Sequence, residues 1–130
     1  MKTLILFTTL FTFAFVSSCN KIAGEGGTSK ITGKVWIVDL NASGDTIAQY
    51  AGMDEDVYII YGEGTNTYSD KFSSSFDGTY EFSHLTPGKY TVFAYSKCST
   101  CPSEQNVIKK TIEIKAKNEA ISVEDLIIIQ

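Results

Sequence analysis

Arginine is missing from this chain of 130 residues, and basic residues are fewer than acidic ones, 11 against 15, which gives a formal net charge of −4. Arginine is the side chain best suited to bidentate binding of phosphate or carboxylate, because its guanidinium is planar and offers paired donors. A mildly acidic chain also lacks the excess of positive charge with which proteins bind nucleic acid or anionic lipid. The composition therefore argues against nucleic acid or anionic lipid as a partner.

Sequence motifs of catalysis are missing as well. No serine or cysteine lies in a nucleophile elbow, and no His-Glu-x-x-His run occurs. The single histidine, His84, lies in a predicted turn, where a histidine is usually a surface residue. The stretch 39–45 matches the first half of a calcium loop, but Tyr50 stands where the bidentate glutamate is required. We expect no catalytic residue, no cofactor and no metal site.

An apolar leader opens the chain. Lys2 supplies a positive charge, and residues 4–16 form an apolar stretch too short to span the ~30 Å hydrocarbon core of a bilayer. No second apolar stretch is long enough to cross a membrane. The leader ends in Val16-Ser17-Ser18-Cys19, and this order resembles the lipobox of bacterial lipoproteins. The resemblance implies that the peptide 1–18 is removed and that the Cys19 thiol carries diacylglyceryl.

The residues that follow Cys19 predict a tether and then one domain. Gly24–Ser29 is a Gly-rich polar stretch with little to bury, which is typical of a flexible segment. We predict a signal peptide at 1–18, a lipidated flexible tether at 19–30 and a single domain at 31–130. Asn20 does not resemble the aspartate that some bacteria use as an inner-membrane retention signal, and a strongly acidic surface-export stretch is missing. The expected location is the bacterial cell envelope, anchored by lipid in the outer membrane and facing the periplasm rather than the cell surface.

Hydrophobic periodicity in the predicted domain has a period of two, because aromatic and β-branched residues alternate with polar ones. Asp77-Gly78 is the dipeptide that most readily forms a tight hairpin turn. Leu126–Ile129 is a continuous apolar run, which indicates burial on both faces. The pattern predicts an all-β domain of seven strands packed as two sheets. The expected strands lie within residues 31–40, 57–61, 68–76, 79–83, 90–94, 107–116 and 121–129.

Two adjacent segments carry a recognisable signature. Residues 76–82 read Phe-Asp-Gly-Thr-Tyr-Glu-Phe, and residues 85–92 read Leu-Thr-Pro-Gly-Lys-Tyr-Thr-Val, after an opening Ile31-x-Gly33-x-Val35 strand. This pattern resembles the carboxypeptidase regulatory-like, or prealbumin-like (transthyretin-like, Cna-B-like), β-sandwich. The resemblance implies a seven-stranded antiparallel, Ig-like sandwich over residues 31 to about 129. It implies little about function, because such domains serve as spacers, adhesion modules, sugar-binding modules and appendages to enzymes. The side chains expected to bury most apolar area are Tyr80, Phe82, Leu85, Tyr90 and Val92.

Cys98 and Cys101 are separated by two residues, and such a pair can form a disulfide, bind metal or exchange electrons. Outside the cytoplasm a disulfide is the default state. A redox role would place the first cysteine at a helix N-terminus within a βαβ pattern, whereas this chain has a loop between two predicted strands. A structural zinc site needs four ligands, and His84 is the only other strong ligand left. We expect a disulfide.

These observations favour a noncatalytic envelope lipoprotein whose β-sandwich acts by binding or structural support, attached to the membrane through its lipid and partnered by an envelope protein or a glycan. A carbohydrate-binding module is the alternative, since exposed aromatic rings can stack on sugars. The candidate ligand-binding residues are Trp36, Tyr58, Tyr68 and Tyr95. Trp36 and at least two tyrosines on one exposed face would favour this alternative, and burial would count against it. A thiol–disulfide redox protein is a third, less favoured hypothesis.

Overall fold

The computed structural model describes residues 22–64 and 67–130, so the predicted signal peptide and the lipidation site Cys19 lie outside the described residues. This described part is built from β-strands and contains no helix, and so nothing in it has the form of a membrane-spanning helix. Nine strands are found within it: β1 (Glu25–Leu40), β2 (Thr46–Ala51), β3 (Asp56–Tyr61), β4 (Asp70–Ser73), β5 (Thr79–Leu85), β6 (Gly88–Lys97), β7 (Gln105–Ile114), β8 (Ala120–Ser122) and β9 (Leu126–Ile129). The predicted all-β class is therefore confirmed.

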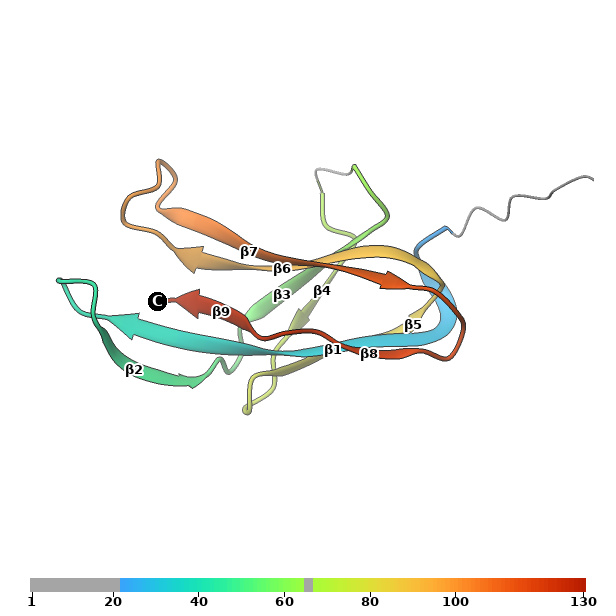
Figure 1. Ribbon diagram of the computed structural model, residues 1–130, viewed down its shortest axis with the longest axis horizontal. Coiled ribbons are helices and arrows are strands. Elements are labelled where there is room, and N and C mark those ends of the chain that lie inside the picture. The colour runs from blue at the N-terminus through green and yellow to red at the C-terminus, as the bar shows by residue number, and fades with distance from the viewer. Residues whose placement is uncertain (1–21, 65–66) are drawn as a thin grey trace, which may run out of the picture.

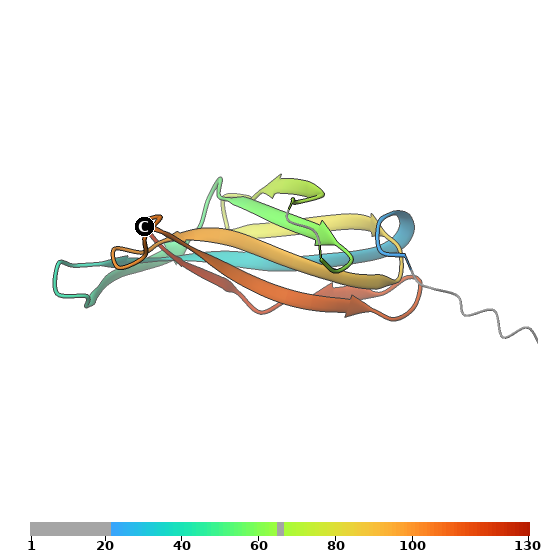
Figure 2. The same ribbon diagram turned by 90° about the horizontal axis from the view of Figure 1, so that it is seen from above.

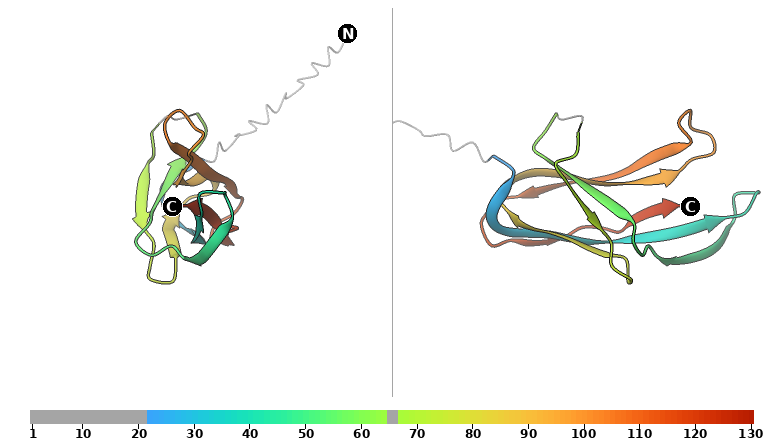
Figure 3. Two further views of the ribbon diagram at one scale, coloured as in Figure 1. Left: turned by 90° about the vertical axis from the view of Figure 1, so that its left-hand side faces the viewer. Right: turned by 180° about the vertical axis from the view of Figure 1, so that it is seen from behind.

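The strands form two sheets, seen as two layers in the end-on view of Figure 3. The five-stranded sheet is organised around β1, a strand of 16 residues that runs along most of the long axis (Figure 1). β2 and β5 follow one another along one edge of β1, because the Val35 N–H donates to the Gly78 carbonyl while the Val35 carbonyl accepts from the Gly52 N–H. β8 and β9 pair in parallel with β1. The other sheet has the antiparallel order β4-β3-β6-β7.

The core lies between the two layers and matches the sequence signature. Tyr80, Phe82, Leu85, Tyr90 and Val92 are all buried, as predicted. Gly33 faces Tyr80 across the β1–β5 ladder, and a Cβ at this position would overlap the Tyr80 ring. The glycine of the Ile31-x-Gly33-x-Val35 pattern is therefore needed to make room for an aromatic ring.

Two features raise the number of strands above the predicted seven. Residues 46–51 form β2, which the sequence does not signal because its side chains are exposed and show no apolar alternation. The predicted strand at 121–129 is divided into β8 and β9, which pair with different parts of β1. Burial in β9 alternates, with Ile127 54% exposed beside a buried Ile128, so the predicted burial on both faces is wrong. β9 has one face toward the other sheet and the other face toward solvent.

The folded domain begins earlier than predicted. β1 starts at Glu25, and Ser29 is fully buried. The Ser29 hydroxyl donates to the Ala116 carbonyl at 3.1 Å and accepts from the Glu119 N–H at 3.0 Å, so the loop between β7 and β8 holds this segment. The prediction that residues 19–30 are a flexible tether is therefore wrong for residues 25–30, because long-range hydrogen bonds compensate for their lack of apolar side chains.

A hydrogen-bonded corner ties the start of the chain to the turn between β5 and β6. This turn carries the chain from one sheet to the other. The Tyr90 hydroxyl donates to the Thr86 carbonyl at 2.6 Å and accepts from the Gly24 N–H at 3.0 Å. The Thr86 N–H in turn donates to the Gly24 carbonyl at 2.9 Å. One phenol therefore joins the crossover turn to the segment that leads into β1, an arrangement like the tyrosine corner of other β-sandwiches.

Candidate functional site

Aromatic side chains gather on the outer face of the four-stranded sheet. In β3, Val57 and Ile59 point into the core, so Tyr58 between them points outward. In β6, the same alternation sends Phe93 and Tyr95 to the outer face. Together with Tyr68, which precedes β4, they form a group that we call the aromatic cluster: Tyr58, Tyr68, Phe93 and Tyr95.

Tyr58 is the centre of the aromatic cluster. It lies opposite Phe93 in the β3–β6 ladder, and the two rings stack with centroids 5.1 Å apart and planes 17° apart. Tyr68 and Tyr95 meet Tyr58 edge to face, with centroid distances of 4.8 Å and 5.5 Å. These separations are those of favourable aromatic pairs, each worth about 0.5–1.5 kcal/mol beyond area burial. The rings therefore hold one another in place on the sheet.

Exposure within the aromatic cluster is uneven, and this decides what the surface can bind. Phe93 is only 8% exposed, whereas Tyr68 and Tyr95 are 49% and 45% exposed. The inner pair of rings supplies a packed floor, and the two flanking tyrosines present ring surface to solvent. Large exposed apolar groups that are clustered, rather than scattered, are a mark of interaction sites.

Polar groups adjoin the aromatic cluster on the same face. Lys71 lies opposite Tyr58 in the β3–β4 ladder, and its Nζ is 2.9 Å from Asp56 Oδ2. Ser73 Oγ donates to Asp56 Oδ1 at 3.0 Å, and the Tyr58 hydroxyl donates to Asp56 Oδ2 at 3.4 Å. The hydrogen bond from Lys71 lowers the pKa of Asp56, while burial and the nearby Asp56 charge raise the pKa of Tyr58. At neutral pH the site therefore offers a carboxylate, an ammonium and protonated hydroxyls.

An open hollow of about 440 Å³ lies beside the aromatic cluster over β6 and β7. The ladder places three residue pairs in it: Tyr95 with Val107, Phe93 with Lys109, and Thr91 with Thr111. Apolar, charged and hydroxyl groups thus follow one another along the two strands. Such a mixture of apolar wall and few polar groups is typical of small-molecule sites.

Trp36 does not join the predicted tyrosines. It lies in β1 of the other sheet, opposite Ala51 of β2 and Ile127 of β9. Its neighbours Val35 and Ile37 are buried between the sheets, so Trp36 points away from the core on the opposite outer face, where it is half-buried. Of the four predicted ligand-binding residues, the structure brings together Tyr58, Tyr68 and Tyr95. The condition stated for sugar binding, Trp36 and at least two tyrosines on one exposed face, is therefore not met, since the tyrosines share a face without the tryptophan.

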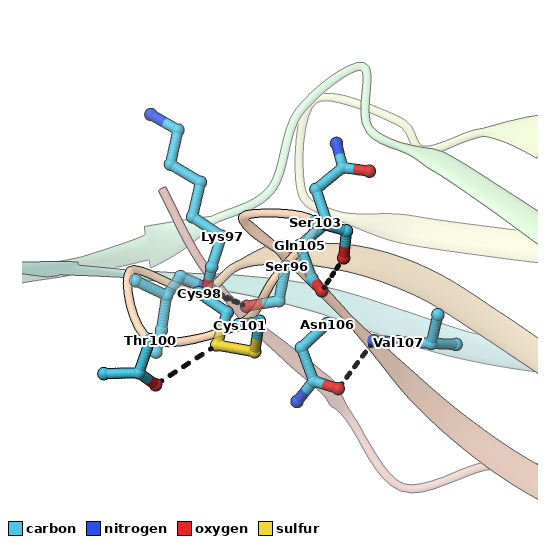
Figure 4. Close-up of a disulfide and its surroundings, with 10 residues drawn as sticks. Ser96, Lys97, Cys98, Thr100, Cys101, Ser103, Gln105, Asn106 and Val107 are labelled. Carbon is cyan, nitrogen blue, oxygen red and sulfur yellow. Dashed lines mark hydrogen bonds between the residues drawn. A yellow bond between two sulfur atoms is a disulfide. The ribbon is translucent and has the colours of Figure 1, made fainter.

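A disulfide joins Cys98 and Cys101, as the sequence predicts. Figure 4 shows it in the hairpin loop between β6 and β7, where the Thr100 hydroxyl lies 3.6 Å from Cys98 Sγ. The Cys98 N–H donates to the Glu104 carbonyl at 3.0 Å, which closes the loop above the bridge. The loop follows a strand and not a helix, so it lacks the helix N-terminus that activates thiols in redox motifs.

Metal ligation finds no geometric basis in residues 22–64 and 67–130, where no three His, Cys, Asp or Glu side chains come together. His84 is exposed near the end of β5, where the pairing of β5 with β1 is irregular, and it adopts a positive φ of 57°. Its Nδ1 lies 3.0 Å from the hydroxyl of its neighbour Ser83. The prediction that His84 lies in a turn is therefore wrong: the residue belongs to β5, and it is part of neither the aromatic cluster nor the disulfide loop.

Comparisons with known proteins bear on the fold. No family model matches the sequence, and no curated protein matches it. The chain is similar to the crystal structure of a proposed carbohydrate-binding protein from Pseudomonas aeruginosa, with a TM-score of 0.50 and 12% sequence identity. The similarity covers 83% of this chain and 92% of that chain. At this identity the likeness concerns the fold alone.

Sequence reasoning missed two parts of the site. Phe93 is two residues from Tyr95 and next to the buried Val92, so strand alternation over residues 90–97 predicts that its side chain points outward. The pairing of Asp56 with Lys71 had no such signal, because it depends on the register between β3 and β4 across a long connection.

Proposed function

We propose that this protein is a noncatalytic carbohydrate-binding module that uses the outer face of the four-stranded sheet. The observation that carries the proposal is the aromatic cluster, in which exposed Tyr68 and Tyr95 flank the packed Tyr58–Phe93 pair. A sugar ring has an apolar face of C–H groups and a rim of hydroxyls. The aromatic rings match the first, and the Asp56, Lys71 and threonine groups match the second.

The chemistry of the site favours binding over glycoside hydrolysis. Hydrolysis commonly requires a pair of carboxyl groups, one of which stays protonated to act as general acid. Asp56 is the acid at the aromatic cluster, and its hydrogen bonds to Lys71 and Ser73 favour its ionised form. Such a carboxylate accepts hydrogen bonds from sugar hydroxyls well and is a poor proton donor.

The wider biology of the proposal rests on sequence patterns. The prealbumin-like signature and the fold neighbour from Pseudomonas aeruginosa support a sandwich of the kind used for sugar binding. The lipobox-like leader supports anchoring to the outer membrane through Cys19, with the domain facing the periplasm. The Cys98–Cys101 disulfide fits an oxidising compartment. In this proposal the ligand is a glycan of the cell envelope or its surroundings.

The test is glycan binding by the full-length lipidated protein in detergent micelles. We would measure affinity by calorimetry against laminarin, xylan, polygalacturonate and hyaluronate, with Tyr95→Ala as the site variant. Tyr50→Ala is the matched control, because Tyr50 is 43% exposed, close to the 45% of Tyr95, but lies on the other sheet. We expect Tyr95→Ala to weaken binding about 2–10-fold, the value of one aromatic contact. Binding of no polymer, or equal weakening by both variants, would contradict the proposal.

A further inference from the structure

The hollow beside the aromatic cluster contains a lysine without an acidic partner. Its lining includes Lys89, Lys109 and Glu63. Lys89 Nζ lies 2.6 Å from Glu63 Oε1, so these two charges neutralise one another. Lys109 forms no ion pair with any acid of residues 22–64 and 67–130. The chain as a whole is acidic, with a net charge of −4, yet this hollow has a surplus positive charge.

The register of β6 and β7 places that charge next to the stacking surface. Lys109 is the cross-strand partner of Phe93, and Tyr95 is the partner of Val107. Lys109 and Tyr95 are therefore diagonal neighbours on one face, about 7–8 Å apart at the backbone and within reach of long side chains. A single sugar residue seated on Tyr95 would have the Lys109 ammonium at its edge.

The hydroxyls on the far side of Lys109 complete the arrangement. Thr91 and Thr111 face one another in the ladder, one step along the strands from Phe93 and Lys109. The hollow thus presents an aromatic ring, then an ammonium, then a pair of hydroxyls. Lysine is a compact point charge rather than a bidentate fork, so it suits a single anionic group without fixing its orientation.

We propose that the ligand of this surface is an acidic polysaccharide, in which Lys109 binds the carboxylate of a uronic acid residue that stacks on Tyr95. This inference rests on the proposed carbohydrate-binding function and specifies its ligand class. It predicts that affinity depends on the ligand's charge and falls with salt, because an exposed ion pair is screened. A neutral polymer with the same backbone would retain the stacking and lose the ion pair.

The experiment compares polygalacturonate with its fully methyl-esterified form, which has the same backbone without the charges. We would titrate the full-length protein in detergent at 50 mM and 200 mM NaCl, with Lys109→Gln as the test and Lys97→Gln as the control. Lys97 is also an exposed lysine that forms no ion pair with an acid of residues 22–64 and 67–130, and it lies at the end of β6 outside the hollow at Lys109. The wild type should bind the acid form about fivefold more tightly, the value of one exposed ion pair.

The outcomes separate the two proposals. Lys109→Gln should remove the preference for the acid form and leave binding of the methyl ester unchanged, while Lys97→Gln should keep the preference. If the wild type binds both polymers equally and Tyr95→Ala weakens both, the ligand class is wrong and the carbohydrate-binding function stands. A preference that survives Lys109→Gln also overturns the inference. If no polysaccharide binds, both proposals fail.

Discussion

Replacing tyrosine by phenylalanine is expected to change the free energy of unfolding differently at two buried tyrosines of this fold. Tyr90 and Tyr80 are both fully buried in the core. The Tyr90 hydroxyl makes hydrogen bonds of 2.6 Å to the Thr86 carbonyl and 3.0 Å from the Gly24 N–H. The Tyr80 hydroxyl has no hydrogen-bond partner among the protein atoms of residues 22–64 and 67–130. Removing the hydroxyl therefore has a different cost at each position.

Tyr90→Phe should lower the free energy of unfolding by about 1–3 kcal/mol. The change removes one strong donor to Thr86 and leaves the Gly24 N–H without its acceptor, and each lost bond costs about 1 kcal/mol or more when a partner stays unpaired. Tyr80→Phe should be neutral or stabilising by up to about 1 kcal/mol, because it removes a buried polar atom that gains nothing from the protein. The ring volume is kept in both variants.

Urea denaturation followed by fluorescence and circular dichroism measures both changes. In a domain of this size we expect Tyr90→Phe to lower Tm by about 5–15 °C and to lower the urea midpoint at constant slope. The reasoning is refuted if Tyr80→Phe is as destabilising as Tyr90→Phe, or if Tyr90→Phe lies within about 0.5 kcal/mol of the wild type. A changed slope for either variant would instead indicate a change in the unfolded or native ensemble.

Three further predictions concern the core, the loop and the site. Gly33→Ala should destabilise the domain by about 1–3 kcal/mol in urea denaturation, because the new Cβ overlaps a buried ring; wild-type stability would contradict this packing. Reduction of the Cys98–Cys101 disulfide should lower the free energy of unfolding by about 2 kcal/mol, the closure entropy of so short a loop, and should leave glycan affinity unchanged. If the reduced pair of thiols reduces a test disulfide, the redox hypothesis is supported instead. The hydrogen bond from Lys71 lowers the pKa of Asp56. The stabilisation that this ion pair gives to the folded state is therefore present at neutral pH and is lost below about pH 4. Asp56→Asn should therefore flatten the fall in Tm between pH 5 and pH 2, and an unchanged pH profile would show that the ion pair contributes nothing.

The core could be predicted from the sequence because the signature contains both turn residues and alternating apolar residues next to them. Asp77-Gly78 forms a tight turn, in which Gly78 has a φ of 80°, but this turn joins β4 and β5 of different sheets, so the predicted hairpin is wrong. Burial of Tyr80 follows from strand alternation after that turn, and burial of Tyr90 follows from alternation after the next turn, between β5 and β6. Local patterns of this kind depend on backbone geometry within a few residues, so they can be read without knowing the topology.

Features that depend on distant partners could not be read. β2 lacks an apolar face, and it is a strand because the edge of β1 offers it hydrogen bonds. Segment 25–29 looked flexible for the same reason, although Ser29 is held by the loop between β7 and β8. A period-two pattern indicates which side chains are buried, but it does not indicate which strands pair through their backbones.

The candidate site shows the same division. Tyr58 and Tyr95 alternate with core residues in their strands, which indicates that their side chains point outward. The same alternation in β1 predicts an outward side chain for Trp36 as well. Which of two opposite outer faces a residue occupies depends on which sheet its strand joins. The three predicted tyrosines lie together because β3, the segment before β4 and β6 belong to one sheet, whereas the tryptophan lies in β1. Their role in ligand binding remains a prediction.

Parallel pairing of β1 with β9 has a mechanical consequence. The described chain starts beside the beginning of β1 and ends just after β9, and Figures 1 and 2 show these points well apart along the long axis, with the C-terminus short of the end formed by the β1–β2 hairpin. A pull between the two ends would slide β1 along β9 and load the ladder at Val35–Val38 in shear. Hydrogen bonds loaded in shear break together, whereas those of a peeled hairpin break one after another. A module tethered at its N-terminal end and held at its C-terminal end would therefore resist tension along its strongest direction.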